Sequence, residues 1–207
     1  GDTEKYGIDT DFFRTSKLEN PSFLRSYVEA IRFMELPKNA RVLSLGVSHG
    51  AELAIFEDLV DTSELSLVGV DHCASAIAAA RARYPRACYE FIEGNIQDLD
   101  AQTLGCFDLL IAINTLHSPS IDGHHVFQNL LKNYLRPEGG VIVGVPNSRT
   151  VDHQIVYGAR TKNYSSPELS PLWKEVGFYR RYLHQHGYRV RVMGKHTILI
   201  VGKHQTR

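Results

Sequence analysis

The sequence predicts an α/β fold in which helices cover both faces of a doubly wound, mostly parallel sheet of seven strands. Short apolar runs without polar alternation, typical of strands buried on both faces, alternate with segments of helical periodicity. This rhythm breaks near the end, where two strand-like runs follow each other across Gly194 and Lys195. A tight glycine turn joins two strands into a hairpin, so one C-terminal strand is expected to run antiparallel to the others.

The first part of the chain alternates strands and helices after an N-terminal helix. Asn20 and Pro21 open that helix, as its cap and its first helical residue. Its apolar stripe consists of Phe23, Tyr27, Ile31 and Met34. Strands are then expected at residues 41–45 and 65–70, with helices at 51–60 and 73–84. The second strand ends at Asp71, and Pro85 stops the second helix.

The remaining elements complete the sheet. Strands are expected at residues 87–93, 106–114 and 139–145, with a helix at about 123–135. A loop at 146–170, a helical stretch at 168–186 and the hairpin strands at 188–193 and 197–203 follow. Sheets of this kind bind ligands beyond the carboxyl ends of their strands, where the strand order reverses.

Composition suits one soluble globular domain. The 207 residues are 43% hydrophobic, and 23 Lys and Arg balance 23 Asp and Glu. The cysteines, Cys73, Cys88 and Cys106, are odd in number and fit neither a disulfide framework nor a zinc site, so we expect a reducing, cytoplasmic location. No apolar run approaches about 18 residues and no secretory signal precedes the core, so we expect no membrane association.

The loop after the first strand predicts a ligand that contains a ribose. Gly46 permits a tight turn and Gly50 a close approach of the backbone to a ligand, beside the free N–H groups of the next helix. Asp71 is expected at an exposed strand end, where its carboxylate can accept hydrogen bonds from both ribose hydroxyls. A purely structural turn is the alternative. A nicotinamide dinucleotide is disfavoured, because residues 46–51 lack the G-x-G-x-x-G spacing that holds a pyrophosphate.

Five stretches in order resemble the motifs of the class I S-adenosylmethionine-dependent methyltransferases. They are VLSLGVSHGAE, LVGVDHCASAIAAAR, FIEGNIQDL, FDLLIAINTLH and LLKNYLRPEGGVIVGVPN. The resemblance covers residues 41–203 and implies S-adenosylmethionine as the cofactor. It implies one methyltransferase-like domain at 1–207, with residues 1–36 as an N-terminal helical cap and 146–170 as a loop on the substrate side.

The resemblance also implies roles for individual residues. The first loop, with Leu45, Gly46, Ser48 and Gly50, would line the methionine end of the cofactor. Asp71 would hold the ribose, His72 would pack beside the adenine, Asn95 and Ile96 would meet the adenine edge, and Asn114 would lie beside the sulfonium. Two positions depart from the family: Ser44 replaces an acidic residue and Ser48 replaces a glycine. Both motivate a second hypothesis, a non-catalytic binding protein with a methyltransferase fold.

Methyl transfer to a hydroxyl can use a histidine as the base, and His117 is the first candidate for this role. Asn114 is the other residue expected at the catalytic end of the site. A solvent-facing loop histidine is the alternative role for His117. His49 is a weaker candidate that can equally cap the next helix. His124 and His125 lack carboxylate or cysteine partners at metal-ligand spacing, so no metal is expected. Residues 114–117, NTLH, lack the two prolines and the aromatic of the amino-methylating members, which disfavours methylation of a base's exocyclic amine.

The acceptor is predicted to be a small molecule rather than RNA. Aromatic residues in the segments outside the cofactor half suit a lid over a small molecule. They are Tyr6, Phe12, Phe13, Tyr157 and Tyr164. Residues 176–207 contain seven Lys and Arg but no Asp or Glu, interleaved with aromatics, which makes an RNA methyltransferase the alternative. A solvated helix face and a charged edge strand account for the same pattern. A monomer and a homodimer are both compatible with the sequence.

Overall fold

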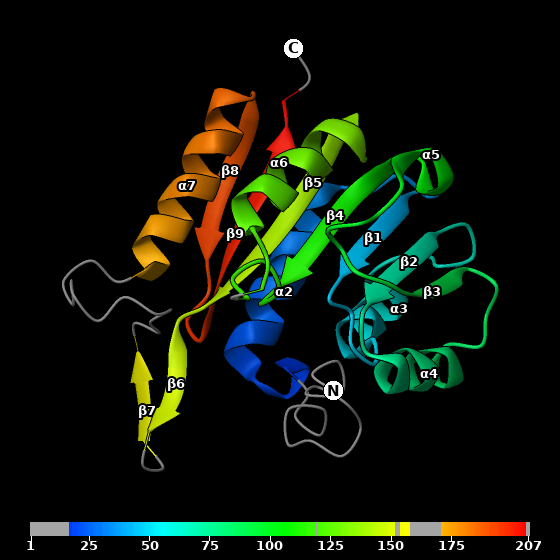
Figure 1. Cartoon of the computed structure of the whole chain (residues 1–207), viewed down its shortest axis with the longest axis horizontal. Helices are drawn as coiled ribbons and strands as arrows, with labels where there is room; N and C mark the ends of the chain where they lie inside the picture. Colours follow the sequence, from blue (N-terminus) through cyan, green and yellow to red (C-terminus); the bar gives the residue numbers. More distant parts are fainter. Residues whose placement is uncertain (1–16, 119, 152–153, 158–170, 206–207) are drawn as a thin grey trace.

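The computed structural model describes residues 17–118, 120–151, 154–157 and 171–205. Its central element is one seven-stranded sheet (Figure 1). Its strands are β1 (Arg41–Leu45), β2 (Ser66–Asp71), β3 (Tyr89–Glu93), β4 (Phe107–Ile113), β5 (Leu135–Pro146), β8 (Tyr188–Met193) and β9 (Thr197–His204). They are arranged in the order β3-β2-β1-β4-β5-β9-β8. Strands β1 to β5 pair in parallel, whereas β9 runs antiparallel to both β5 and β8. The predicted fold class is therefore confirmed, including the antiparallel strand of the C-terminal hairpin.

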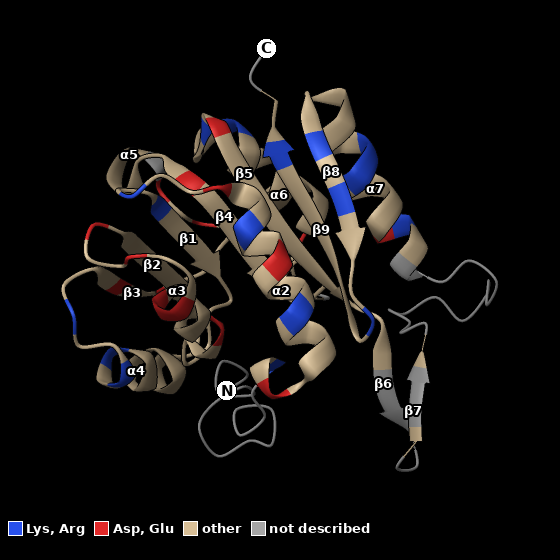
Figure 2. Ribbon diagram, turned by 180° about the vertical axis from the view of Figure 1, so that it is seen from behind, with Lys and Arg blue, Asp and Glu red and all other residues tan. Residues whose placement is uncertain are grey.

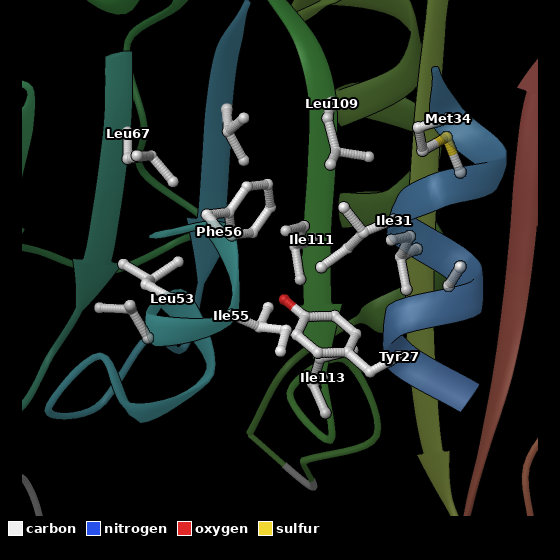
Figure 3. Close-up of a cluster of buried hydrophobic side chains, with 14 of the residues drawn as sticks. Tyr27, Ile31, Met34, Leu53, Ile55, Phe56, Leu67, Leu109, Ile111 and Ile113 are labelled. Carbon is white, nitrogen blue, oxygen red and sulfur yellow. The ribbon is translucent and has the colours of Figure 1, made fainter. Parts of the chain in front are cut away.

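Helices cover both faces of this sheet, as predicted (Figure 1). One face carries α2 (Pro21–Met34), α3 (Ala54–Leu59) and α4 (Ala74–Arg83), and the other carries α5 (Ala101–Leu104), α6 (Gly123–Asn133) and α7 (Pro171–Gln185). Each face has its own apolar cluster, because successive residues of a strand point to opposite sides. In Figure 3, side chains from α2 and α3 converge with those of β4 on the first face. Among the described residues, no helix is long and apolar enough to cross a bilayer.

The N-terminal helix α2 begins where its capping signal predicts. The Asn20 side chain accepts hydrogen bonds from the backbone N–H groups of Ser22 and Phe23, and Pro21 occupies the first turn. The predicted apolar stripe is buried, and its central residue Tyr27 is fully enclosed against the sheet (Figure 3). The turn that precedes α2, η2 (Lys17–Glu19), lies beside the first loop, because Lys17 pairs with Glu52. The N-terminal end of α2 is therefore close to the carboxyl edge of the sheet.

Several elements differ from the sequence-based expectation, among them the short helix α5, which was not predicted. The helix after β1 opens with a 3-10 turn, η3 (Ala51–Leu53), so its α-helical part is shorter. Helix α6 ends at Asn133 and β5 starts at Leu135, because Pro137 disfavours helical geometry in the residue before it. Part of the predicted loop at 146–170 forms an antiparallel hairpin, β6 (Ser148–Val151) with β7 (Gln154–Tyr157).

Candidate functional site

The carboxyl ends of β1, β2 and β4 meet at the middle of the sheet, where the strand order reverses. Strand β1 lies between β2 and β4. Strands β2 and β3 follow on one side of β1, and β4 and β5 follow on its other side. At such a reversal the loops after neighbouring strands diverge and leave room for a ligand. The predicted site residues Gly46, Asp71 and Asn114 all lie at or just beyond these three strand ends.

The loop after β1 is held against the end of β2. Gly46, Ser48 and Gly50 all have positive φ angles, of 64°, 50° and 73°. The N–H groups of Gly46 and Val47 both donate to the Val70 carbonyl, at 2.8 and 3.1 Å. The alternating left-handed residues therefore fold the loop into a compact turn with its backbone tied to the neighbouring strand.

Each glycine of this loop is also required by a neighbouring side chain. A Cβ atom on Gly46 would lie 2.4 Å from Oγ1 of Thr115, which itself donates to the Leu45 carbonyl at 2.9 Å. A Cβ atom on Gly50 would lie 2.9 Å from the Tyr84 ring, whose hydroxyl donates to the Gly50 carbonyl at 2.8 Å. The sequence predicted that a ligand would approach the backbone closely at Gly50. In the structure the Tyr84 ring makes this close approach.

Asp71 ends β2 and contacts both the loop after β1 and the loop after β2. The prediction that it lies at an exposed strand end was wrong. The residue is only 7% exposed. Its Oδ2 accepts from the Ser48 N–H at 2.8 Å, and its Oδ1 accepts from the Cys73 N–H at 3.0 Å. His72, next in the chain, places Nδ1 3.5 Å from Oδ1. The two backbone donors satisfy the carboxylate, as expected for a buried polar group.

The two residues predicted at the adenine edge follow β3. Ile96 is buried in the core of the second face, whereas Asn95 is exposed. The Asn95 Oδ1 accepts from the Gln97 N–H at 3.1 Å, and its Nδ2 donates to Asp98 at 2.8 Å. This turn orients the Asn95 side chain, and its carbonyl oxygen keeps capacity for a second hydrogen bond.

The end of β4 carries two polar side chains with incomplete hydrogen bonding. Asn114 has a φ of 56°, and its Nδ2 lies 3.5 Å from the Thr197 hydroxyl. Its Oδ1 is buried without a hydrogen-bond partner among the described residues, and so is Nδ1 of His117. Burial lowers the pKa of His117, an effect opposed by the charge of Glu175 and reinforced by that of Lys17. The ring is therefore neutral at neutral pH and able to accept a proton.

The other histidines differ in their surroundings. Burial lowers the pKa of His49, whose Nδ1 lies 3.4 Å from the Ser48 hydroxyl. The expected helix cap is not made by this side chain, because the capping residue of η3 is Gly50. His124 places Nε2 3.1 Å from Glu175, at the start of α7. Within the described ranges, no group of His, Cys, Asp and Glu side chains could hold a metal ion.

The substrate-side segments are described in part. Hairpin β6–β7 contacts the β8–β9 turn, where the rings of Tyr157 and His196 have centroids 5.4 Å apart. At the other side, Lys17 pairs with Glu52 at 2.6 Å beside the first loop. The other predicted lid residues, Tyr6, Phe12, Phe13 and Tyr164, lie outside the described residues.

Sequence reasoning missed three residues that shape this site. They are Tyr84, which supports the first loop, Thr115, which joins the loops after β1 and β4, and Glu175, which contacts His124. Thr115 directly follows a recognised position, so its proximity to the site could have been inferred. Tyr84 and Glu175 are distant in sequence from the residues they contact and carry no local signal of that contact.

Ser48 occupies a backbone conformation that glycine adopts freely. A side chain with a Cβ atom costs about 1–2 kcal/mol in the left-handed region, and Ser48 has a φ of 50°. We expect Ser48→Gly to raise the free energy of unfolding by about 1 kcal/mol in denaturant titrations. Ser48→Ala is the matched control, because it keeps the Cβ atom and should give no gain. Equal stability of Ser48→Gly and the parent would mean that no strain resides here.

The fold and the site together define a Rossmann-like methyltransferase architecture. A family model described as Methyltransferase domain (Methyltransf_31) matches residues 36–181. The chain therefore belongs to this family, and the predicted class I S-adenosylmethionine-dependent methyltransferase is confirmed. Ser44, the departure from the family's acidic position, is buried in β1 between Gly69 and Ile111 of the neighbouring strands.

Solved structures share this fold at low sequence identity. A chain from the complex of the Haloferax volcanii Trm112 methyltransferase activator with a protein assigned as a methyltransferase is 17% identical, with a TM-score of 0.61 and 92% of each chain covered. An Aquifex aeolicus SAM-dependent methyltransferase is 16% identical, with a TM-score of 0.60, covering 90% of this chain and 94% of its own. Aeropyrum pernix fibrillarin, solved with natively bound S-adenosyl-L-methionine, is 15% identical, with a TM-score of 0.58 and coverages of 84% and 73%. No curated protein sequence gives a significant match.

Proposed function

We propose that the chain binds S-adenosylmethionine across the carboxyl ends of β1, β2 and β4 and transfers its methyl group to a small-molecule hydroxyl or a similar nucleophile. The observation that carries this proposal is the end of β4, where Asn114 and His117 each keep a buried polar atom without a partner in the described part of the chain. Such atoms are rare in folded proteins. The hydroxyls of Tyr27 and Tyr179 share this state within the two apolar clusters, whereas Asn114 and His117 follow the carboxyl end of β4, where a bound ligand would complete the contact.

The residues present fit this cofactor. A carboxylate has about four lone-pair positions, and the two backbone donors of Asp71 occupy two of them, which leaves acceptors for two ribose hydroxyls. The unpartnered Oδ1 of Asn114 suits the positively charged end of the cofactor. The residues that would hold it are Leu45, Gly46, Ser48 and Gly50 at the methionine end, Asp71 at the ribose, His72, Asn95 and Ile96 at the adenine, and Asn114 at the sulfonium.

In this proposal the chain contributes alignment and one proton transfer. When bound, S-adenosylmethionine supplies a methyl group that is already activated by the sulfonium charge. The loops after β1 and β4 would align the two reactants and exclude water. His117 would accept the proton of an acceptor hydroxyl, because burial lowers its pKa and keeps its ring neutral at neutral pH.

The distribution of basic residues favours a small acceptor over RNA. On β8, the guanidinium groups of Arg189 and Arg191 lie over the ring of Phe33 in α2, at 4.5 and 4.2 Å. Arg180 and Arg181 are exposed on α7, which covers the opposite face of the sheet. In Figure 2 the blue ribbon segments, which mark Lys and Arg, occur on both β8 and α7. A polynucleotide would need a continuous basic track that leads to the site.

Calorimetric titration with S-adenosylmethionine and with S-adenosylhomocysteine tests the cofactor half of this proposal. We expect saturable binding of both compounds to the full chain. An absence of binding at millimolar S-adenosylmethionine would contradict the enzyme hypothesis and favour the non-catalytic alternative.

A methyl-transfer experiment tests which class of molecule accepts the methyl group. With cofactor carrying a labelled methyl group, we expect label in the low-molecular-weight fraction of a cell extract and none in its RNA. Label confined to RNA that is removed by ribonuclease would overturn the small-molecule acceptor while leaving the methyltransferase activity intact.

A further inference from the structure

Strand β9 brings a buried hydroxyl to the carboxyl end of β4. Because β9 runs antiparallel to β5, its first residue, Thr197, lies at the edge where the parallel strands end, paired with Pro146. Thr197 is only 8% exposed, and its Oγ1 lies 3.5 Å from Nδ2 of Asn114. These two residues are 83 apart in the chain, so the contact is created by the packing of the C-terminal hairpin beside the parallel strands.

A glycine in β5 lets side chains from β4 and β9 meet across it, although β5 lies between these two strands. A Cβ atom on Gly144 would lie 3.1 Å from Cγ2 of Thr197 and 3.1 Å from Cγ2 of Ile113. The absence of a side chain at Gly144 therefore leaves room for Thr197 to reach Asn114. The Gly144 carbonyl also accepts from the backbone N–H of Asn114 at 2.8 Å, which ties the end of β4 to β5.

The turn between β8 and β9 holds Thr197 in place. Gly194 has a φ of 107°, and a Cβ atom there would lie 2.1 Å from the Thr197 carbonyl oxygen, so the turn closes tightly. The Asn147 N–H donates to the His196 carbonyl at 2.8 Å, and its Nδ2 donates to the Lys195 carbonyl at 2.7 Å. The residue before Thr197 and the one before that are therefore both bound to the end of β5.

We propose that Thr197 is a positioning residue that orients the Asn114 amide toward the sulfonium of the cofactor. This inference rests on the proposed place of Asn114 beside that group. The nitrogen and oxygen of an amide diverge from one carbon, so an amide whose nitrogen donates to Thr197 directs its oxygen away from Thr197. That oxygen, Oδ1, is the atom that is buried without a partner among the described residues.

The orientation of the amide decides the charge that Asn114 presents to the site. Its backbone is fixed by the bond to Gly144, so the remaining freedom lies in the side chain. A fixed carbonyl oxygen favours a positively charged sulfonium and contributes little to the neutral thioether of S-adenosylhomocysteine. A reversed amide would turn its NH₂ group toward the sulfonium and oppose binding. Thr197 therefore acts on the preference of the site for the charged form of the cofactor.

Calorimetry with both forms of the cofactor tests this preference. Thr197→Val keeps the shape of the side chain but removes the hydroxyl. We expect its affinity for S-adenosylmethionine to fall by about tenfold, as for the loss of one weak charge-assisted contact, and its affinity for S-adenosylhomocysteine to stay at the parental value. Thr62→Val is the matched control, because Thr62 is equally buried but precedes β2, where the parallel strands begin.

Thr197→Ser separates the hydroxyl from packing. Ser keeps the hydroxyl and loses the methyl group that lies against Gly144, whereas Val keeps both branches of the side chain. We expect Thr197→Ser to retain the parental ratio of the two affinities. A role in packing alone would reverse this order, with Thr197→Ser more impaired than Thr197→Val, and that result would overturn the inference.

NMR of the chain without cofactor tests the contact itself. With ¹⁵N-asparagine, the side-chain NH₂ signals of Asn114 are identified by their loss in Asn114→Asp. They should move in Thr197→Val and stay unchanged in Thr62→Val. Moved signals combined with a parental affinity ratio in Thr197→Val would overturn the inference and leave the proposed function intact. Failure of the parent to bind either compound would instead contradict the proposed function, and with it the role of Thr197 toward the cofactor.

Discussion

Asp71→Ala is expected to weaken S-adenosylmethionine binding by about a hundredfold or more. A carboxylate that holds both ribose hydroxyls makes two charge-assisted hydrogen bonds, each of about 1.5–3 kcal/mol. Loss of both hydrogen bonds therefore costs more binding free energy than the roughly 2.8 kcal/mol that corresponds to a hundredfold change in dissociation constant. Calorimetric titration of the parent and the variant measures the difference.

Asp71→Ala should also lower stability, contrary to what an exposed strand end would predict. The carboxylate accepts the N–H groups of Ser48 and Cys73, which Ala would leave without an acceptor. A buried donor that loses its partner costs about 1–3 kcal/mol, so for the two donors we expect a loss of roughly 2–6 kcal/mol in denaturant unfolding. Affinity must therefore be measured at a temperature at which the variant is folded.

The adjacent strand provides a control for the Asp71 experiment. Glu93 ends β3 as the register partner of Asp71 and is exposed. Glu93→Gln should bind the cofactor as tightly as the parent. If Glu93→Gln weakens binding while Asp71→Ala does not, the ribose lies one strand further along the sheet and the motif assignment is wrong.

His117→Gln is expected to reduce turnover by about 10²–10⁴-fold while leaving cofactor affinity unchanged. This range is the usual contribution of a general base, and Gln keeps a polar side chain of similar length without a group that titrates near neutrality. Initial rates of labelled methyl transfer to the acceptor, together with calorimetry, measure the two quantities. Parental turnover would show that alignment alone suffices for this acceptor.

The pH dependence of the same reaction gives a second test of His117. Burial lowers the pKa of His117 from its ordinary value of 6.5, so the neutral, base-competent ring persists below pH 6.5. We expect kcat/KM to fall with decreasing pH, with the midpoint of the fall below pH 6.5, and the fall to disappear in His117→Gln. A fall centred above pH 6.5 in the parent would point to another titrating group.

The sequence alone predicted the order of the strands of the main sheet and placed three candidate site residues at strand ends. The Asn20–Pro21 opening of α2, the buried strands and the positions of Gly46, Asp71 and Asn114 at strand ends all follow from local periodicity and turn chemistry. These signals extend over a few residues, and a parallel sheet then brings consecutive strand ends to the same edge.

Only the tertiary structure decided which groups meet at that edge. The bond from Tyr84 to the Gly50 carbonyl joins residues 34 apart, and the contact of His124 with Glu175 joins residues 51 apart. The burial of Asp71 likewise depends on the Ser48 N–H, 23 residues earlier. Periodicity and turn propensity describe the backbone within one element, whereas these contacts depend on how separate elements pack, so they first become visible when the sheet and its helices are assembled.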